Sequence, residues 1–86
     1  MVVSPVRLTL IGKPDCHLCE DARAVVDSVV ADCGVPVVVD ELSILDDAEL
    51  HAKYWDEIPV IVIDGRVHGI WRFEADRLRA AILAAV

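Results

Sequence analysis

The first half of the sequence switches between two spacings of apolar residues, and this switching limits the possible folds more than any other feature. Residues 6–11 are aliphatic or β-branched apart from Arg7, and they stop at the turn formers 12–15, as a buried strand would. Residues 35–42 have the same strand-like composition. Between them, apolar residues at helical spacing predict a helix from about 17 to 33 that ends at Gly34, namely Leu18, Ala22, Val25, Val26, Val29, Val30 and Cys33. A strand, a helix and a strand with short connections predict parallel pairing through a right-handed crossover.

The second half adds a helix, a hairpin and a last helix. Asp46, with Glu49 three residues later, is typical of a helix start, and a short helix over 48–54 follows. The apolar runs 60–63 and 66–71 flank Asp64-Gly65, which predicts an antiparallel hairpin. Apolar residues at helical spacing predict a final helix over 74–86. We therefore expect one α/β domain over residues 1–86, ordered βαβαββα, with a four-stranded mixed sheet flanked by helices.

Size, charge and cysteine content exclude several classes of protein. The 86 residues allow one core, and 56% hydrophobic residues are enough to fill it. A net charge of −7 excludes nucleic acid as a main partner. No apolar run is long enough to span a membrane, residues 1–7 lack the pattern of an export signal, and three cysteines do not form a paired disulfide framework. We expect a cytoplasmic monomer without a membrane partner.

Cys16 and Cys19 are placed where a redox dithiol would be, at the junction of the first strand and the first helix. Unpaired backbone N–H groups and the helix dipole favour a thiolate at Cys16, and the thiolate is the nucleophile of disulfide exchange. Lys13 and a protonated His17 support that charge, whereas Asp15 opposes it. Cys19, three residues on, shares a helix face with Cys16 and can resolve a mixed disulfide. The sequence therefore predicts a thiol-disulfide oxidoreductase in which Cys16 attacks and Cys19 resolves.

Other functions remain open for the same residues. A structural zinc site needs four ligands, but Cys33, His51 and His68 are single and widely separated, so we expect no metal site and no bound cofactor. A metal site assembled in three dimensions, or an iron–sulfur cluster shared between two chains through Cys16, is the less favoured alternative. A thioredoxin-fold module that senses redox state or binds a partner, without catalysis, is the other alternative. Cys33 itself is expected to be a small core residue.

Two segments carry a resemblance that covers nearly the whole chain. Lys13-Pro14-Asp15-Cys16-His17-Leu18-Cys19 after the first strand and Glu57-Ile58-Pro59-Val60 before the third resemble the thioredoxin superfamily, and most closely the small glutaredoxin-like proteins. The resemblance implies a cis proline at Pro59 beside the dithiol, with the Ile58 backbone free to pair with an extended substrate. It makes Lys13, His17, Ile58 and Pro59 the expected substrate-binding residues. It also implies glutathione mixed disulfides or protein disulfides as substrates, with glutathione as a possible co-substrate and glutathione or thioredoxin reductase as the reductant.

The chain departs from the family pattern at two places. The segment 68–76 lacks the glycine pair that precedes the last helix in glutaredoxins, and Arg72 or Asp76 is the candidate replacement. His17-Leu18 stands where the family commonly has Pro-Tyr. Trp55 and Trp71 fit plain packing better than a substrate surface.

Overall fold

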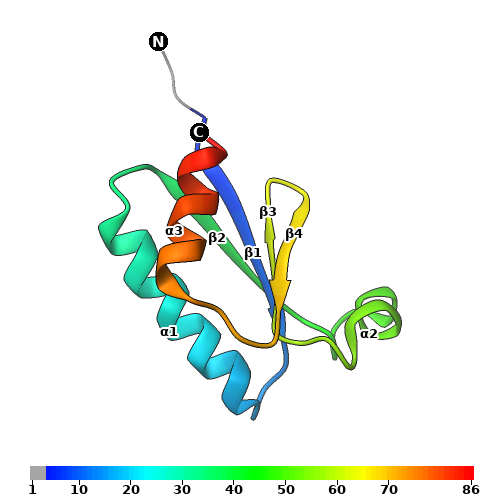
Figure 1. Cartoon of the computed structure of the whole chain (residues 1–86). Coiled ribbons are helices and arrows are strands. Elements are labelled where there is room, and N and C mark those ends of the chain that lie inside the picture. The colour runs from blue at the N-terminus through cyan, green and yellow to red at the C-terminus, as the bar shows by residue number, and fades with distance from the viewer. Residues whose placement is uncertain (1–3) are drawn as a thin grey trace.

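The computed structural model describes residues 4–86 and contains the seven elements in the expected order. They are β1 (Val6–Gly12), α1 (His17–Asp32), β2 (Val37–Ser43), α2 (Ala48–Tyr54), β3 (Val60–Ile63), β4 (Arg66–Ile70) and α3 (Ala75–Ala84). The four strands form one mixed sheet in the order β2-β1-β3-β4 (Figure 1). The α/β class and the βαβαββα order are confirmed.

The strand directions bring two strand-to-helix connections to the same end of the sheet. β1 and β2 are parallel, with Val6 opposite Val37, as expected for a crossover through α1. β3 is antiparallel to both β1 and β4, so β4 runs in the same direction as β1. The segments that lead from β1 into α1 and from β4 into α3 therefore leave the sheet at the same end, where both strands finish.

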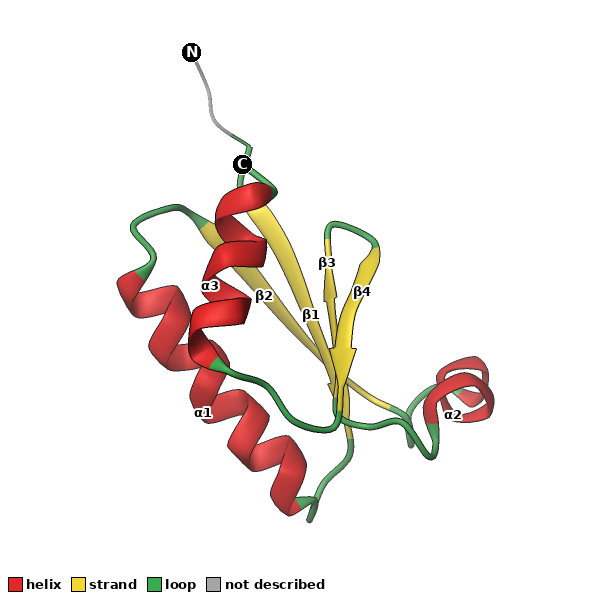
Figure 2. Ribbon diagram, viewed as in Figure 1, coloured by secondary structure: helices red, strands yellow, loops and turns green. Residues whose placement is uncertain are grey.

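α1 and α3 lie side by side on one face of the sheet and enclose the main core (Figure 2). Each helix buries one stripe of its apolar residues, as the spacing predicts. The core contains Val6, Leu8, Leu10, Ala22, Val26, Val29, Ile61, Ile63, Leu78 and Ile82. This packing fixes the start of α1 against the end of β1.

The opposite face of the sheet is covered only near one end. There α2 contributes Tyr54 to a second cluster with Ile11, Ile44 and Val60. Farther along this side of the molecule, Val38 and Val67 remain 41% and 54% exposed. The helices thus flank the sheet unequally.

Several element ends differ from the sequence prediction. The N-cap of α2 is Asp47 and not Asp46, because the Asp47 carboxylate accepts the N–H groups of Glu49 and Leu50. α1 ends at Asp32, with Gly34 just beyond its end at φ +75° as expected for a glycine in this position. α3 is shorter than predicted and spans Ala75–Ala84. None of the helices within residues 4–86 is long and apolar enough to cross a bilayer. The expectation that residues 1–7 contain no export signal falls partly on residues 1–3, which lie outside the described residues.

Candidate active site

Cys16 and Cys19 form a disulfide at the start of α1, with their Cα atoms 5.2 Å apart. Cys16 is the N-cap residue, and its Sγ atom accepts the backbone N–H of Cys19 at 3.3 Å. The same donor would stabilise a negative charge on that sulfur once the disulfide is reduced. Cys16 is partly exposed, whereas Cys19 is only 2% exposed. A disulfide from solution can therefore reach the first residue of the pair more easily than the second.

Gly12, the last residue of β1, makes this arrangement possible. A Cβ atom at this position would lie 2.8 Å from the Cys19 Sγ atom and 3.2 Å from its Cβ atom, closer than packing allows. The absence of a side chain lets the strand approach the buried sulfur. The sequence prediction treated Gly12 only as a turn former, and its one signal was a glycine at the end of a strand four residues before Cys16.

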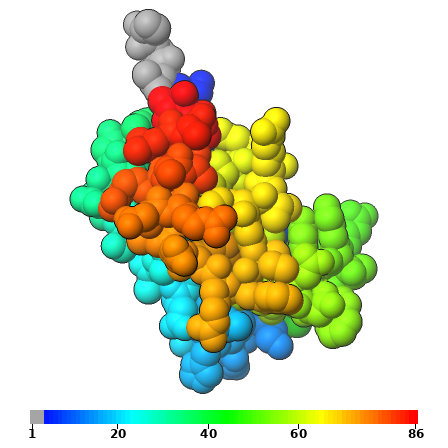
Figure 3. Space-filling model, viewed as in Figure 1, coloured from blue at the N-terminus to red at the C-terminus, as the bar shows by residue number. Residues whose placement is uncertain are grey.

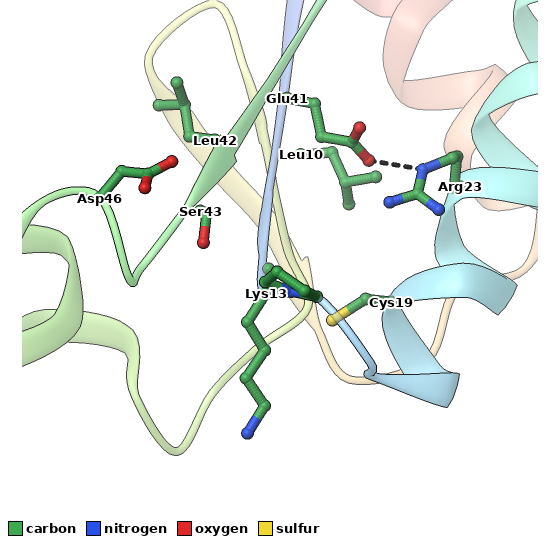
Figure 4. A pocket seen from close by; sticks show the side chains of 10 residues that line it. Leu10, Lys13, Cys19, Arg23, Glu41, Leu42, Ser43 and Asp46 are labelled. Carbon is green, nitrogen blue, oxygen red and sulfur yellow. Dashed lines mark hydrogen bonds and ion pairs between the residues drawn. The ribbon is translucent and has the colours of Figure 1, made fainter.

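A pocket of about 350 Å³ opens beside Cys19 on the β2 side, and Lys13 contributes to its lining (Figure 4). Arg23 of α1 and Glu41 of β2 meet across it, with Arg23 Nε donating to Glu41 Oε1 at 2.6 Å. Both side chains are about half exposed, so this ion pair contributes little to stability but fixes the spacing of helix and strand at the pocket. The sequence prediction missed both residues because no local pattern links positions 18 apart.

The Ile58-Pro59 peptide bond is cis, as the family resemblance implies. Val60 pairs with Ile11, so the register places Pro59 across from Gly12, the residue that contacts Cys19. Trp71 donates its backbone N–H to the Pro59 carbonyl at 2.8 Å. Among residues 4–86, no backbone hydrogen bond outside the helices and strands uses the N–H or C=O of Ile58.

His17 lies apart from the other expected substrate-binding residues. Its side chain is 99% exposed, and its Nδ1 atom lies 3.7 Å from Glu20 Oε2. The structure therefore places Cys16, Cys19, Lys13, Ile58 and Pro59 around one edge of the sheet, with His17 on the solvent side of the helix start.

The two tryptophans and Cys33 occupy different environments. Trp55 and Trp71 are 61% and 52% exposed, so neither is part of the core. The Trp71 indole Nε1–H donates to the Asp56 carbonyl at 3.1 Å and holds the connection after β4 against the loop before β3. Cys33 packs against the main core. Within residues 4–86, no group of three or more His, Cys, Asp or Glu side chains is placed to hold a metal ion.

Comparisons with known proteins agree with this geometry. The family model described as "Glutaredoxin-like domain (DUF836)" matches residues 7–83. A curated relative, "Uncharacterized protein Rv0508" of Mycobacterium tuberculosis, is 26% identical over 83 residues, which are 93% of this chain and 86% of that protein. The X-ray structure of XcR50 from X. campestris is 36% identical, covers 92% of this chain and 99% of its own, and has a TM-score of 0.75.

A thioredoxin structure shows the same fold at lower identity. A mutant thioredoxin from Halobacterium salinarum is 18% identical, with a TM-score of 0.71, over 95% of this chain and 75% of its own. The fold is therefore thioredoxin-like, and the family match covers nearly every residue of the chain. The chain belongs to the family described as a glutaredoxin-like domain, and its fold is that of a thioredoxin.

Proposed function

We propose that the protein is a thiol-disulfide oxidoreductase in which Cys16 is the nucleophile and Cys19 the resolving thiol. The observation that carries this proposal is the position of the Cys16 sulfur at the N-terminus of α1, where it accepts the Cys19 N–H. A helix N-terminus favours a thiolate, and a partly exposed thiolate can attack a disulfide in solution. The Cys19 sulfur lies next to the Cys16 sulfur and is buried.

The reaction uses no group beyond the two thiols and the substrate. The Cys16 thiolate attacks one sulfur of a disulfide, and the other substrate sulfur leaves as a thiolate. Cys19 then loses its proton and attacks the Cys16 sulfur, which releases the second substrate thiolate and forms the Cys16–Cys19 disulfide. Two electrons pass from the protein dithiol to the substrate, so each turnover requires a thiol or dithiol donor, for which glutathione or a thioredoxin reductase system is our proposal.

The residues around the dithiol suit glutathione mixed disulfides or protein disulfides. The Lys13 ammonium lies within 4 Å of no carboxylate in residues 4–86 and can bind a substrate carboxylate beside the cysteines. The unused backbone groups of Ile58 can pair with an extended substrate next to Pro59. His17 lies at the solvent side of the same site. We propose that the protein acts in this way as a monomer in the reducing cytoplasm.

Three serine variants test the proposal, with Cys33 as the matched control. Cys16→Ser should lower turnover of a glutathione mixed disulfide by about a thousandfold or more, because a serine hydroxyl is not ionised at neutral pH. Cys19→Ser should still attack and should accumulate a mixed disulfide on Cys16 that mass spectrometry detects. Cys33→Ser should keep full activity. Full dithiol activity in both the Cys16 and the Cys19 variant would contradict the proposal, and parallel assays with glutathione or thioredoxin reductase identify the donor.

A further inference from the structure

The basic side chains of this acidic protein are unevenly distributed. Arg7, Arg23 and Arg79 form ion pairs with carboxylates, and Lys53 lies over the Tyr54 ring. The other four of the eight Lys and Arg residues have no carboxylate within 4 Å among residues 4–86, and they are Lys13, Arg66, Arg72 and Arg77. Lys13 belongs to the active site. The remaining three all lie between the start of β4 and the first turn of α3.

These arginines line a series of hollows between β4 and α3, which we call the β4–α3 groove. One hollow of about 470 Å³ contains Arg66 and His68, and a second of about 470 Å³ contains His68, Arg72, Phe73 and Arg77. His68 lines both, so they adjoin one another. Figure 3 shows the hairpin of β3 and β4 (yellow) beside α3 (orange to red) on this face of the molecule.

The groove leads towards the dithiol. Arg72 and Phe73 also line a third, smaller hollow of about 90 Å³, which they share with Trp71 and with Leu18 of α1. Leu18 is one of the two residues between Cys16 and Cys19. The third hollow therefore connects the groove to the first turns of α1, the helix whose N-cap is Cys16.

The shape of this surface favours an extended chain as the occupant. Within residues 4–86, β4 pairs only with β3, so the outer edge of β4 is open to another backbone. The hollows follow β4 and the connection after it in sequence order, as the side-chain sites for an extended peptide would.

The charge of the surface favours an acidic chain. The two larger hollows contain two carboxylates of their own, Asp64 and Glu74, and the smallest hollow adds Asp21 of α1. Asp64 Oδ1 already accepts the Arg7 N–H at 2.8 Å. In the two larger hollows, three arginines against two acids leave a local positive charge on a protein of net charge −7.

We propose that the β4–α3 groove binds an acidic, extended segment of a protein disulfide substrate, with Arg72 and Arg77 holding its carboxylates while its sulfur reaches Cys16. This inference rests on the proposed function and adds a substrate class to it. Because the arginines are near the surface, they should act mainly on the rate of association and on its salt dependence.

Single-turnover oxidation of the fully reduced protein tests the inference without an external reductant. The substrates are three peptides of equal length with Glu, Gln or Lys residues before one cysteine, each as the mixed disulfide with 2-mercaptoethanol. In each reaction the protein dithiol becomes a disulfide, and the peptide thiol and mercaptoethanol are released. The Glu peptide should react about five- to tenfold faster than the Gln peptide, and the Lys peptide more slowly than both, with differences that shrink as salt is added.

The double variant Arg72→Gln/Arg77→Gln should reduce the Glu-to-Gln rate ratio to near one. The matched control Arg7→Gln/Lys53→Gln changes the net charge equally outside the groove and should keep the wild-type ratio. A wild-type ratio near one, or a ratio that survives in the groove variant, would overturn the inference. The wild-type reaction with bis(2-hydroxyethyl) disulfide, a small neutral substrate, tests the proposed function separately.

A binding measurement tests the groove even if the redox chemistry fails. The Glu peptide with serine in place of cysteine, titrated into the oxidised protein, should shift the amide NMR signals of residues 66–77, and the Arg72→Gln/Arg77→Gln variant should lose these shifts. Shifts confined to other residues would overturn the inference. Shifts in the groove with glutathione alone and none with the peptide would also overturn it, because they would indicate a site for a small thiol.

Discussion

The two connections that leave the sheet beside the dithiol are alike in backbone but different in chemistry. Residues 13–16 join β1 to α1, and residues 71–74 join β4 to α3, so each connection has four residues. Each contains one non-glycine residue with positive φ, Asp15 at 58° and Trp71 at 68°. Both strands run in the same direction, and both helices lie on the same face of the sheet.

The helix starts that follow differ in what caps them. At α1 the Cys16 sulfur accepts the Cys19 N–H. At α3 the N-cap residue Glu74 makes no side-chain hydrogen bond to the helix. The first connection follows the close contact of Gly12 with the buried Cys19 sulfur and adds Lys13 to the pocket beside it, whereas the second has bulky residues that line the β4–α3 groove. Under our two proposals, one backbone design serves reaction in the first connection and recognition in the second.

The largest predicted effect tests the close packing of the first connection. Gly12→Ala should lower the free energy of unfolding of the oxidised protein by about 1–3 kcal/mol, because overpacking in a core costs this much and the new Cβ atom would lie 2.8 Å from the Cys19 Sγ atom. Turnover should fall with it, since Cys19 must move. Urea denaturation and a disulfide reduction assay measure the two effects.

Two further variants separate a clash with sulfur from a general effect of alanine. Gly34→Ala places its Cβ atom in open space at φ +75°, so it should cost about 1 kcal/mol through backbone strain and leave turnover unchanged. In a Cys19→Ala background the cost of Gly12→Ala should shrink but not vanish, because the Cβ atom of residue 19 remains 3.2 Å away. An undiminished cost in that background would show that the strain lies elsewhere.

A smaller effect is predicted at the start of α3. Glu74→Ser should raise the free energy of unfolding by about 0.5–1 kcal/mol, because Glu74 has the extended backbone of an N-cap and serine is a preferred capping residue. Asp47→Ala, which removes an existing cap from α2, should lower it by about 1 kcal/mol. Thermal unfolding of both variants measures this. If Glu74→Ser did not raise the free energy of unfolding, the start of α3 would be as well stabilised as that of α1, although it lacks a capping hydrogen bond.

The sequence predicted those parts of the fold that depend on residues close together in the chain. Helical spacing located α1 and its stop near Gly34, and Asp64-Gly65 located the hairpin, because each is set by local backbone preferences. The cis peptide bond at Pro59 came from the family resemblance and not from local preference. The Asp46 cap was wrong by one residue, since two adjacent aspartates carry the same local signal and only the start of the helix distinguishes them.

The parts that could not be predicted depend on how different helices and strands pack against one another. The Arg23–Glu41 ion pair joins a helix to a strand whose relative rotation is set by the core. The approach of Gly12 to Cys19 depends on how closely α1 packs on β1. The grouping of Arg66, Arg72 and Arg77 in one groove follows from the direction of β4 relative to α3. Each of these arrangements appears only after the sheet order is known.

The smallest predicted effect concerns His68, which lies in β4 shortly before the second connection. Partial burial, and secondarily the charge of Arg77, lower the pKa of His68 from the ordinary value of 6.5. The unfolded chain therefore binds a proton more readily than the folded one at this position. Acidification should then favour unfolding. The free energy of unfolding should begin to fall as the pH drops through about 6.5, and the loss should be complete below the pKa of His68 in the folded protein.

The pH dependence of thermal unfolding between about pH 7.5 and 5.5 checks this sign, above the range in which most carboxylates titrate. His68→Gln should flatten the decline in Tm. Arg77→Gln should raise the pKa of His68 only in part, since burial is the larger cause, and an NMR titration of the ring measures the shift. No flattening by His68→Gln would contradict the prediction, because the fold beside the second connection would then not disfavour the protonated ring.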